Sequence, residues 1–116
     1  MRGLDITHEA LERFLADDDG QPVVLVNLVR LRPDADSAYR AYAEAVAPLL
    51  AGVGAELVYA GEARGLLIGD ESWDLAAVVR YPSRDALARL VRDPAFAATA
   101  PLRHAALEAG ILHAFA

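Results

Sequence analysis

The 116-residue sequence contains no cysteine. It contains no lysine either, since all 11 of its Lys-plus-Arg residues are arginine. Without a thiolate the chain cannot form a disulfide, a cysteine nucleophile, an iron–sulfur cluster or a thiolate metal site. Without a lysine amine it cannot form a Schiff base. No glycine-rich phosphate-binding pattern and no G-x-S-x-G elbow occurs either. Any chemistry therefore comes from Asp, Glu, His, Arg, Tyr or Asn, or from the substrate itself, and no cofactor is expected.

Long apolar runs are also missing, so no membrane-spanning segment is expected. Residues 1–19 are acidic and lack the basic-then-apolar order of a signal peptide, which predicts a cytoplasmic protein. The net charge of −6 argues against nucleic acid as a partner, since such binding depends on neutralising phosphates. With 55% hydrophobic and 24% charged residues, the chain has the composition of one folded domain.

Hydrophobic periodicity predicts the elements of that domain. A short helix begins at the N-cap Thr7, and the Asp17–Gly20 stretch ends it. The predicted elements that follow are a strand over 22–31, a helix over 36–53, a strand over 55–63, a short second strand within 64–71, a strand over 73–81, a helix capped by Ser83, a further helix from 93 to 110 interrupted at Pro101, and a last strand over 111–116.

This order predicts an α+β fold of the ferredoxin-like βαββαβ type, an antiparallel sheet with helices on one face. We expect residues 1–20 to form an N-terminal helical extension and residues 21–116 to form the domain itself. The strands are apolar on both sides, so the face without helices needs a cover. A second copy of the chain supplies one, and we therefore expect a homodimer whose two sheets face each other in a barrel.

Several strings resemble a domain-of-unknown-function family of the dimeric α/β-barrel superfamily: "VVLVNLVRLRPDAD", "IGDESWD", "VRYPSRDA" and "DPAF" followed by "APLR". The resemblance runs from about Pro22 to the C-terminus and implies the same dimeric fold. The superfamily includes cofactor-free monooxygenases, polyketide cyclases, isomerases and haem-handling enzymes. The family's recurring positions fall on Asn27, Tyr39, Trp73, Asp74, Pro82, Ser83 and Arg103. Its pattern has a tryptophan where Tyr59 stands, which changes the expected shape of the cavity.

Two polar residues interrupt the predicted strands. Asn27 lies at the centre of an apolar strand, where an unpaired amide costs roughly 1–3 kcal/mol. We expect the Asn27 amide to hydrogen-bond in one of two ways. Its partner is either the neighbouring backbone or the partner chain, or it is a ligand oxygen. Asp74 is predicted on the small strand face with Ala76 and Val78, which suits a cavity, whereas Trp73 belongs to the bulky face. Asp74 either forms an ion pair with Arg103 or Arg80, or acts as a general acid/base whose pKa an apolar pocket raises.

Three further residues are candidates for substrate binding. Arg103 on the last helix either pairs with an acid at the surface or binds a carboxylate or enolate oxygen. Tyr59 is expected to line the cavity with its hydroxyl, and Trp73 to shape the pocket at its rim. His8, His104 and His113 have no metal-ligand spacing, so no metal site is expected.

Three functions remain open. The first is a cofactor-independent enzyme, such as a cyclase, isomerase or monooxygenase, that acts on a small apolar, oxygen-rich molecule with Asp74 moving the proton. The second is a module that binds a metabolite in the same cavity without turnover. The third is a dimer whose polar residues are only structural.

Overall fold

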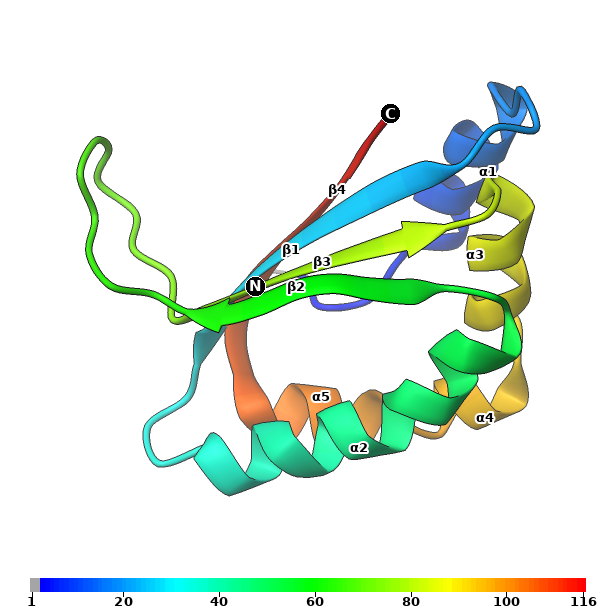
Figure 1. The fold of residues 1–116 in the computed structure, drawn as a ribbon. Helices are drawn as coiled ribbons and strands as arrows, with labels where there is room; N and C mark the ends of the chain where they lie inside the picture. The colour runs from blue at the N-terminus through cyan, green and yellow to red at the C-terminus, as the bar shows by residue number, and fades with distance from the viewer. Residues whose placement is uncertain (1–2) are drawn as a thin grey trace.

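The computed structural model describes residues 3–116. Its elements are α1 (His8–Ala16), β1 (Val23–Leu31), α2 (Asp36–Gly52), β2 (Glu56–Glu62), β3 (Leu75–Tyr81), α3 (Arg84–Val91), α4 (Pro94–Ala97), α5 (Ala100–Ala106) and β4 (Leu107–Phe115). The strands form one antiparallel sheet in the order β2-β3-β1-β4. Figure 1 shows α2, α4 and α5 together on one side of this sheet. The predicted ferredoxin-like arrangement is confirmed, and β1 and β3 are its two central strands.

Side-chain alternation decides which residues enter the core. Val23, Leu25 and Val29 of β1 are buried on the helix side of the sheet. Val23 lies opposite Tyr81 of β3, and both contact the buried leucines of α3. Since successive strand residues point to opposite faces, the residues between them point away from the helices. The apolar run of β1 therefore fills the core with one half of its side chains only.

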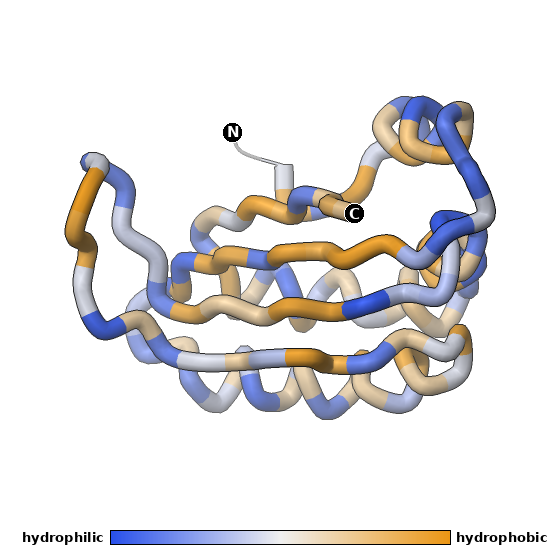
Figure 2. The backbone as a smooth tube through the Cα atoms, turned by 45° about the horizontal axis from the view of Figure 1, so that its top comes forward, coloured by the Kyte–Doolittle hydropathy of each residue, from blue (hydrophilic) through white to orange (hydrophobic). Residues whose placement is uncertain are grey.

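The other half of the strand side chains forms the open face of the sheet. Val26 of β1 lies opposite Val78 of β3, and Val78 lies opposite Tyr59 of β2. The colouring in Figure 2 shows that the central strands are apolar along most of their length. No helix within residues 3–116 lies over the centre of this face (Figure 1). The apolar strands thus present an uncovered surface, as the sequence predicts.

The short strand predicted within residues 64–71 is wrong. Residues 63–74 form a long loop between β2 and β3, and its tip carries Leu67 and Ile68 at 95% and 94% exposure. The loop projects to the side of the sheet opposite α2 (Figure 1). β2 pairs directly with β3, so residues 63–74 form the connection between two neighbouring strands and add no strand to the sheet.

Two strand boundaries also differ from their predicted positions. β4 begins at Leu107 rather than at Ile111, because Leu107 and Ala109 are buried against β1 and draw the chain into the sheet four residues earlier. Gly110 lies within β4 opposite Val29 and does not end a helix. β3 begins at Leu75 rather than at Trp73.

The N-terminal segment shares the hydrophobic core of the sheet. Thr7 is the N-cap of α1, as predicted, since its hydroxyl accepts a hydrogen bond from the Ala10 N–H at 3.1 Å. Ile6 and Phe14 pack against the cluster around Leu25, and Leu4 packs against Val29 and its neighbours. Residues 3–16 therefore help to enclose the space between the sheet and its helices. The division of the chain at residue 20 stays a prediction.

Candidate functional site

A cavity of about 770 Å³ lies between the N-terminal segment, the helix side of β1 and β4, and α5. Its apolar lining includes Leu11 and Phe14 of α1 and Leu107 of β4. Two of the predicted site residues, Asn27 and Arg103, line it together. The structure therefore brings an amide and a guanidinium to one apolar cavity, the kind of site that orients small ligands with few polar groups.

Arg103 of α5 is the buried arginine of this cavity and is only 8% exposed. Its Nε donates hydrogen bonds to the Leu4 carbonyl and to Asp5 Oδ1, each at 3.1 Å, and its Nη2 also donates to Asp5 Oδ1. Its Nη1 donates to the Thr99 hydroxyl at 3.4 Å. The guanidinium carbon lies 5.6 Å from the ring centroid of Tyr42 and 5.3 Å from that of Phe96. These contacts fix the guanidinium in one position.

Asp5 is the partner of a guanidinium and an imidazole ring. Besides Arg103, the His104 ring contacts it, with Nε2 at 3.0 and 2.9 Å from the two carboxylate oxygens. Desolvation alone would raise the pKa of Asp5, but the hydrogen bonds from Arg103 and His104 outweigh it, so that this pKa is lowered. Burial alone would lower the pKa of Arg103, but Asp5 and Tyr42 together raise it. Asp5 is therefore held as an anion and Arg103 as a cation.

Asn27 differs from Arg103 in having no partner of its own. It lies on the helix side of β1, opposite Ala77 of β3 and Leu112 of β4. Within residues 3–116 the side-chain amide of Asn27 makes no hydrogen bond. The amide is not fully buried, since every fully buried side-chain polar atom in that range has a hydrogen-bond partner. The amide faces the cavity and remains available as both donor and acceptor.

Asp74 lies away from this cavity and is exposed. Its Oδ2 accepts a hydrogen bond of 2.7 Å from the Leu31 N–H, at the point where the register of β1 and β4 shifts. The predicted ion pair of Asp74 with Arg103 or Arg80 is wrong, since Arg103 bonds Asp5 and the Arg80 guanidinium lies 3.9 Å from Glu56. A general acid/base role for Asp74 stays a prediction.

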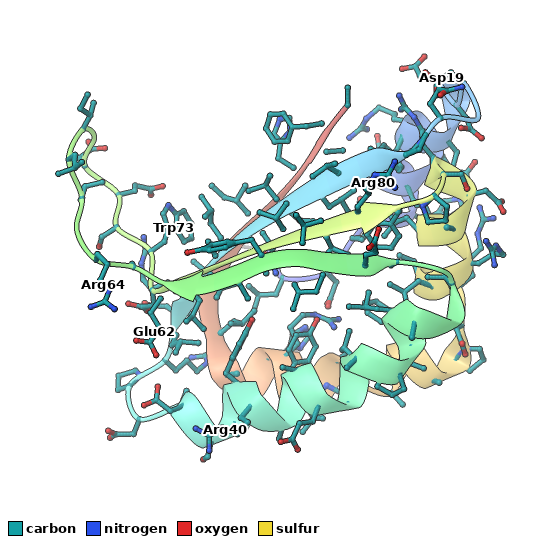
Figure 3. All side chains as sticks on the ribbon, in the orientation of Figure 1. Asp19, Arg40, Glu62, Arg64, Trp73 and Arg80 are labelled. Atoms are coloured by element: carbon teal, nitrogen blue, oxygen red, sulfur yellow. The ribbon has the colours of Figure 1, made fainter. Side chains whose placement is uncertain are left out.

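Trp73 and Tyr59 lie on the open face of the sheet. Figure 3 shows Trp73 on the side away from α2, where the Arg30 guanidinium stacks 4.8 Å from the indole centroid. Tyr59 is 56% exposed and lies against Gly61, where any added side-chain carbon would collide with the Tyr59 hydroxyl. The prediction that Trp73 belongs to the bulky face of the strand is wrong, because that face is the helix side and regular strand alternation begins only at Leu75. The open face carries these two aromatics, and the cavity carries Asn27 and Arg103.

Two cavity residues were not predicted as site residues. Tyr42 lies in α2, and its three-residue spacing from Tyr39 gives no sign of its contact with Arg103. Asp5 precedes the cap of α1, and nothing in the surrounding sequence connects it with a residue 98 positions later. Both contacts depend on tertiary packing alone.

Neither a metal site nor a membrane helix is found in the part of the chain that the structure describes. Within residues 3–116 no group of three or more His, Asp or Glu side chains is arranged to hold a metal ion. His104 pairs with Asp5, and the His113 ring stacks on Phe115 at a centroid distance of 4.8 Å. Over the same range no helix is long and apolar enough to cross a membrane.

The arrangement is suited to holding an oxygen atom that bears negative charge. A fixed guanidinium and a free amide line one largely apolar cavity, where hydrogen bonds to charge are stronger than in water. Such donors bind a carboxylate or phenolate, or stabilise an enolate as it forms.

Comparison with known proteins gives a consistent assignment. A family model described as "Domain of unknown function (DUF1330)" matches residues 27–114. A protein of unknown function from Rhodopseudomonas palustris is 34% identical with a TM-score of 0.89, and the alignment covers 99% of this chain and 96% of that one. No curated protein matches the chain.

Two more distant solved structures share the fold. A protein from Thermobifida fusca, described as a dimeric ferredoxin-like protein of unknown function, is 18% identical with a TM-score of 0.59 over 84% of this chain and 92% of that one. SnoaB from Streptomyces nogalater, described as a cofactor-independent oxygenase, is 19% identical with a TM-score of 0.60 over 83% of this chain and 92% of that one.

Proposed function

The chain belongs to the family of unknown function DUF1330, and we propose that it binds a small apolar molecule carrying oxygen atoms in the cavity lined by Asn27 and Arg103. The free amide of Asn27 is the observation that carries this proposal. The amide is only partly buried and has no protein partner, so water bonds it in the free protein, and a ligand oxygen or hydroxyl that enters the cavity takes the place of that water. Arg103 supplies the charge that selects an electron-rich oxygen.

The proposal is tested with 2-naphthol, an apolar fluorescent probe with one hydroxyl. We expect saturable binding to the wild-type chain, followed by fluorescence titration. Asn27→Leu removes the amide and should weaken binding by roughly tenfold, the loss of about one hydrogen bond. Gln21→Leu, which changes the chain's one other side-chain amide, should have no effect. Equal affinity of wild type and Asn27→Leu would contradict the role of Asn27.

We further propose that the chain turns its ligand over without a cofactor, in the manner of a cyclase, isomerase or monooxygenase. In support, SnoaB, which is similar in fold, is described as a cofactor-independent oxygenase. Asn27 and Arg103 would stabilise the oxyanion that forms when a carbon next to a carbonyl loses its proton. Binding without turnover is the alternative, favoured by the lowered pKa of Asp5, which makes this cavity carboxylate a poor base.

Proton exchange separates these two functions. 2-Tetralone carries acidic hydrogens beside its carbonyl, and their replacement by deuterium in D2O is followed by NMR. An enzyme of the proposed kind should accelerate this exchange, and Arg103→Leu should abolish the acceleration. Asp74, the base expected from the sequence, lies outside this cavity, and it keeps that role only if Asp74→Asn abolishes exchange while the affinity for 2-tetralone is retained. An exchange rate equal to that in buffer would leave binding alone as the function.

The open face supports a proposed homodimer. Its centre is formed by apolar residues such as Val26 and Val78, and Tyr59 and Phe115 on the outer strands are more than half exposed. Uncovered apolar surface of this kind marks an interaction site, and a twofold axis allows one such face to cover its copy. The Thermobifida fusca protein of the same fold is described as dimeric.

A further inference from the structure

We infer that the ligand of the cavity is a carboxylate, and that the Asp5 carboxylate occupies the position which the ligand's carboxylate takes over on binding. This inference rests on the proposed binding function and names the ligand class. It depends on a difference between the two sides of the ion pair. Arg103 is held in place by other contacts, whereas the Asp5 side chain can leave its position beside Arg103 and His104.

The cationic side of the site is fixed without Asp5. Arg103 lies in α5, and its side chain is 10% exposed. It also donates to Thr99 and lies against the rings of Tyr42 and Phe96. Aromatic faces and a hydroxyl hold a guanidinium in place without neutralising its charge. Loss of Asp5 from this position would therefore leave a preformed anion-binding group.

The anionic side is built differently. Asp5 lies in a segment without regular secondary structure, and its side chain is half-exposed. Leu4 and Ile6 on either side of it are anchored in the core clusters. A rotation of the Asp5 side chain toward solvent would therefore vacate the site without detaching the segment.

The geometry around Asp5 is one that any carboxylate can reproduce. Asp5 Oδ1 accepts hydrogen bonds from both Nε and Nη2 of Arg103, and Oδ1 and Oδ2 lie 3.0 and 2.9 Å from Nε2 of His104. A ligand carboxylate can place one oxygen at Arg103 and the other at His104, which the single oxygen of an alcohol or ketone cannot do, and its negative charge strengthens the hydrogen bonds from Arg103. The same cavity offers Leu11, Phe14 and Leu107 to the apolar body of a ligand.

Two matched probes test the inference: 2-naphthoate, which carries a carboxylate, and 2-naphthamide, its neutral isostere. Asp5→Ala removes the competing carboxylate, so 2-naphthoate should bind about tenfold more tightly to this variant than to wild type. The affinity for 2-naphthamide should change by less than about threefold. Added 2-naphthoate should also raise the melting temperature of Asp5→Ala more than that of wild type, because the probe binds the folded state only.

Asp17→Ala is the matched control, because Asp17 also lines the cavity but makes no contact with Arg103 or His104 within residues 3–116. It removes the same charge and should give no selective gain for 2-naphthoate. Asp5→Asn, which keeps the size of the side chain, provides the same test if Asp5→Ala does not fold.

Three results would overturn the inference. An equal gain for both probes would mean that Asp5 only restricts entry to the cavity. An unchanged or weaker affinity for 2-naphthoate in both Asp5 variants would mean that the ion pair is structural. The same gain in Asp17→Ala would indicate a general charge effect. Each leaves the proposed binding function intact if 2-naphthol binds the wild-type chain, whereas failure of all three probes to bind would remove both proposals.

Discussion

Asp74 shows how a single side chain supports the sheet from outside the cavity. Its carboxylate accepts a hydrogen bond from the Leu31 N–H where β1 and β4 change register, and its own N–H donates to the Val29 carbonyl at 2.8 Å. The β1 strand therefore loses a bonded backbone group if this carboxylate is removed. Since the site is exposed, water replaces part of the lost interaction.

We expect Asp74→Ala to lower the free energy of unfolding by about 1 kcal/mol, measured by urea denaturation. Asp74→Asn retains an acceptor oxygen and should lose less. Asp70→Ala, which changes another aspartate of the same loop, serves as the control and should be neutral. If the Asp70 and Asp74 variants lose the same stability, the hydrogen bond to Leu31 contributes nothing measurable.

The charge of Asp5 predicts a pH dependence of stability. Its pKa in the folded chain is lowered from 3.8 by Arg103 and His104, so the folded state holds the proton less tightly than the unfolded state. The contribution of Asp5 is therefore complete above about pH 3.8 and is lost as the pH falls through the lower folded-state value.

Comparing wild type with Asp5→Asn isolates this contribution from that of other carboxylates. At pH 6 the variant should be less stable by about 1 kcal/mol, a charged hydrogen bond discounted for the solvent exposure of Asp5. The difference should shrink toward zero in urea denaturation series carried down to pH 2. A difference that stays constant over this range would contradict the assignment of the titration to Asp5.

A site residue could be predicted from the sequence where a polar side chain interrupts apolar neighbours. Asn27 is noticeable because it interrupts an apolar strand, and the structure places it at the cavity. Asp5 lies between Leu4 and Ile6 in a short N-terminal segment for which no helix or strand is predicted, so the sequence shows no regular apolar element that it interrupts. Its role follows from packing onto α5, which brings together residues 98 positions apart and which no local pattern encodes.

Among the elements, α3 shows how one cap can hold a core helix. The Ser83 hydroxyl accepts a hydrogen bond of 3.2 Å from the Ala86 N–H, and the helix that follows buries Leu87 and Leu90 against the sheet. We expect Ser83→Ala to cost about 1 kcal/mol in thermal or urea unfolding, as is typical for loss of an N-cap. Ser37→Ala, an exposed position in the first turn of α2, should not destabilise the chain.

Element types followed from the sequence where periodicity was long enough to distinguish a helix from a strand. The strand alternation from Leu75 to Tyr81 correctly assigned the bulky side chains to the helix side. Leu66, Leu67 and Ile68 form an apolar run too short for that test, and a strand and a loop tip look alike at this length. Only the direct pairing of β2 with β3 decides between them.

At the scale of the whole molecule, the chain has apolar side chains on both sides of the sheet but helices on one side only. The loop tip at Leu67 and Ile68 projects on the uncovered side, so two apolar surfaces face the same direction (Figures 1 and 2). In a dimer that covers the two sheets, the 63–74 loop of each copy would lie beside the other copy. The sequence predicts this need for a cover because β1 is apolar on both faces, whereas the position of the loop follows only from the fold.

Val78 gives the sharpest test of the dimer. It lies between Val26 and Tyr59 on the open face, so Val78→Glu places a charge at the centre of the proposed interface, where its desolvation is costly. In sedimentation velocity we expect wild type to sediment as a dimer and the variant as a monomer with unchanged far-UV circular dichroism. Ala47→Glu, on the exposed surface of α2, should remain a dimer. A wild-type chain that stays monomeric at high micromolar concentration would contradict the interface, whereas a dimeric Val78→Glu variant would place it elsewhere on the molecule.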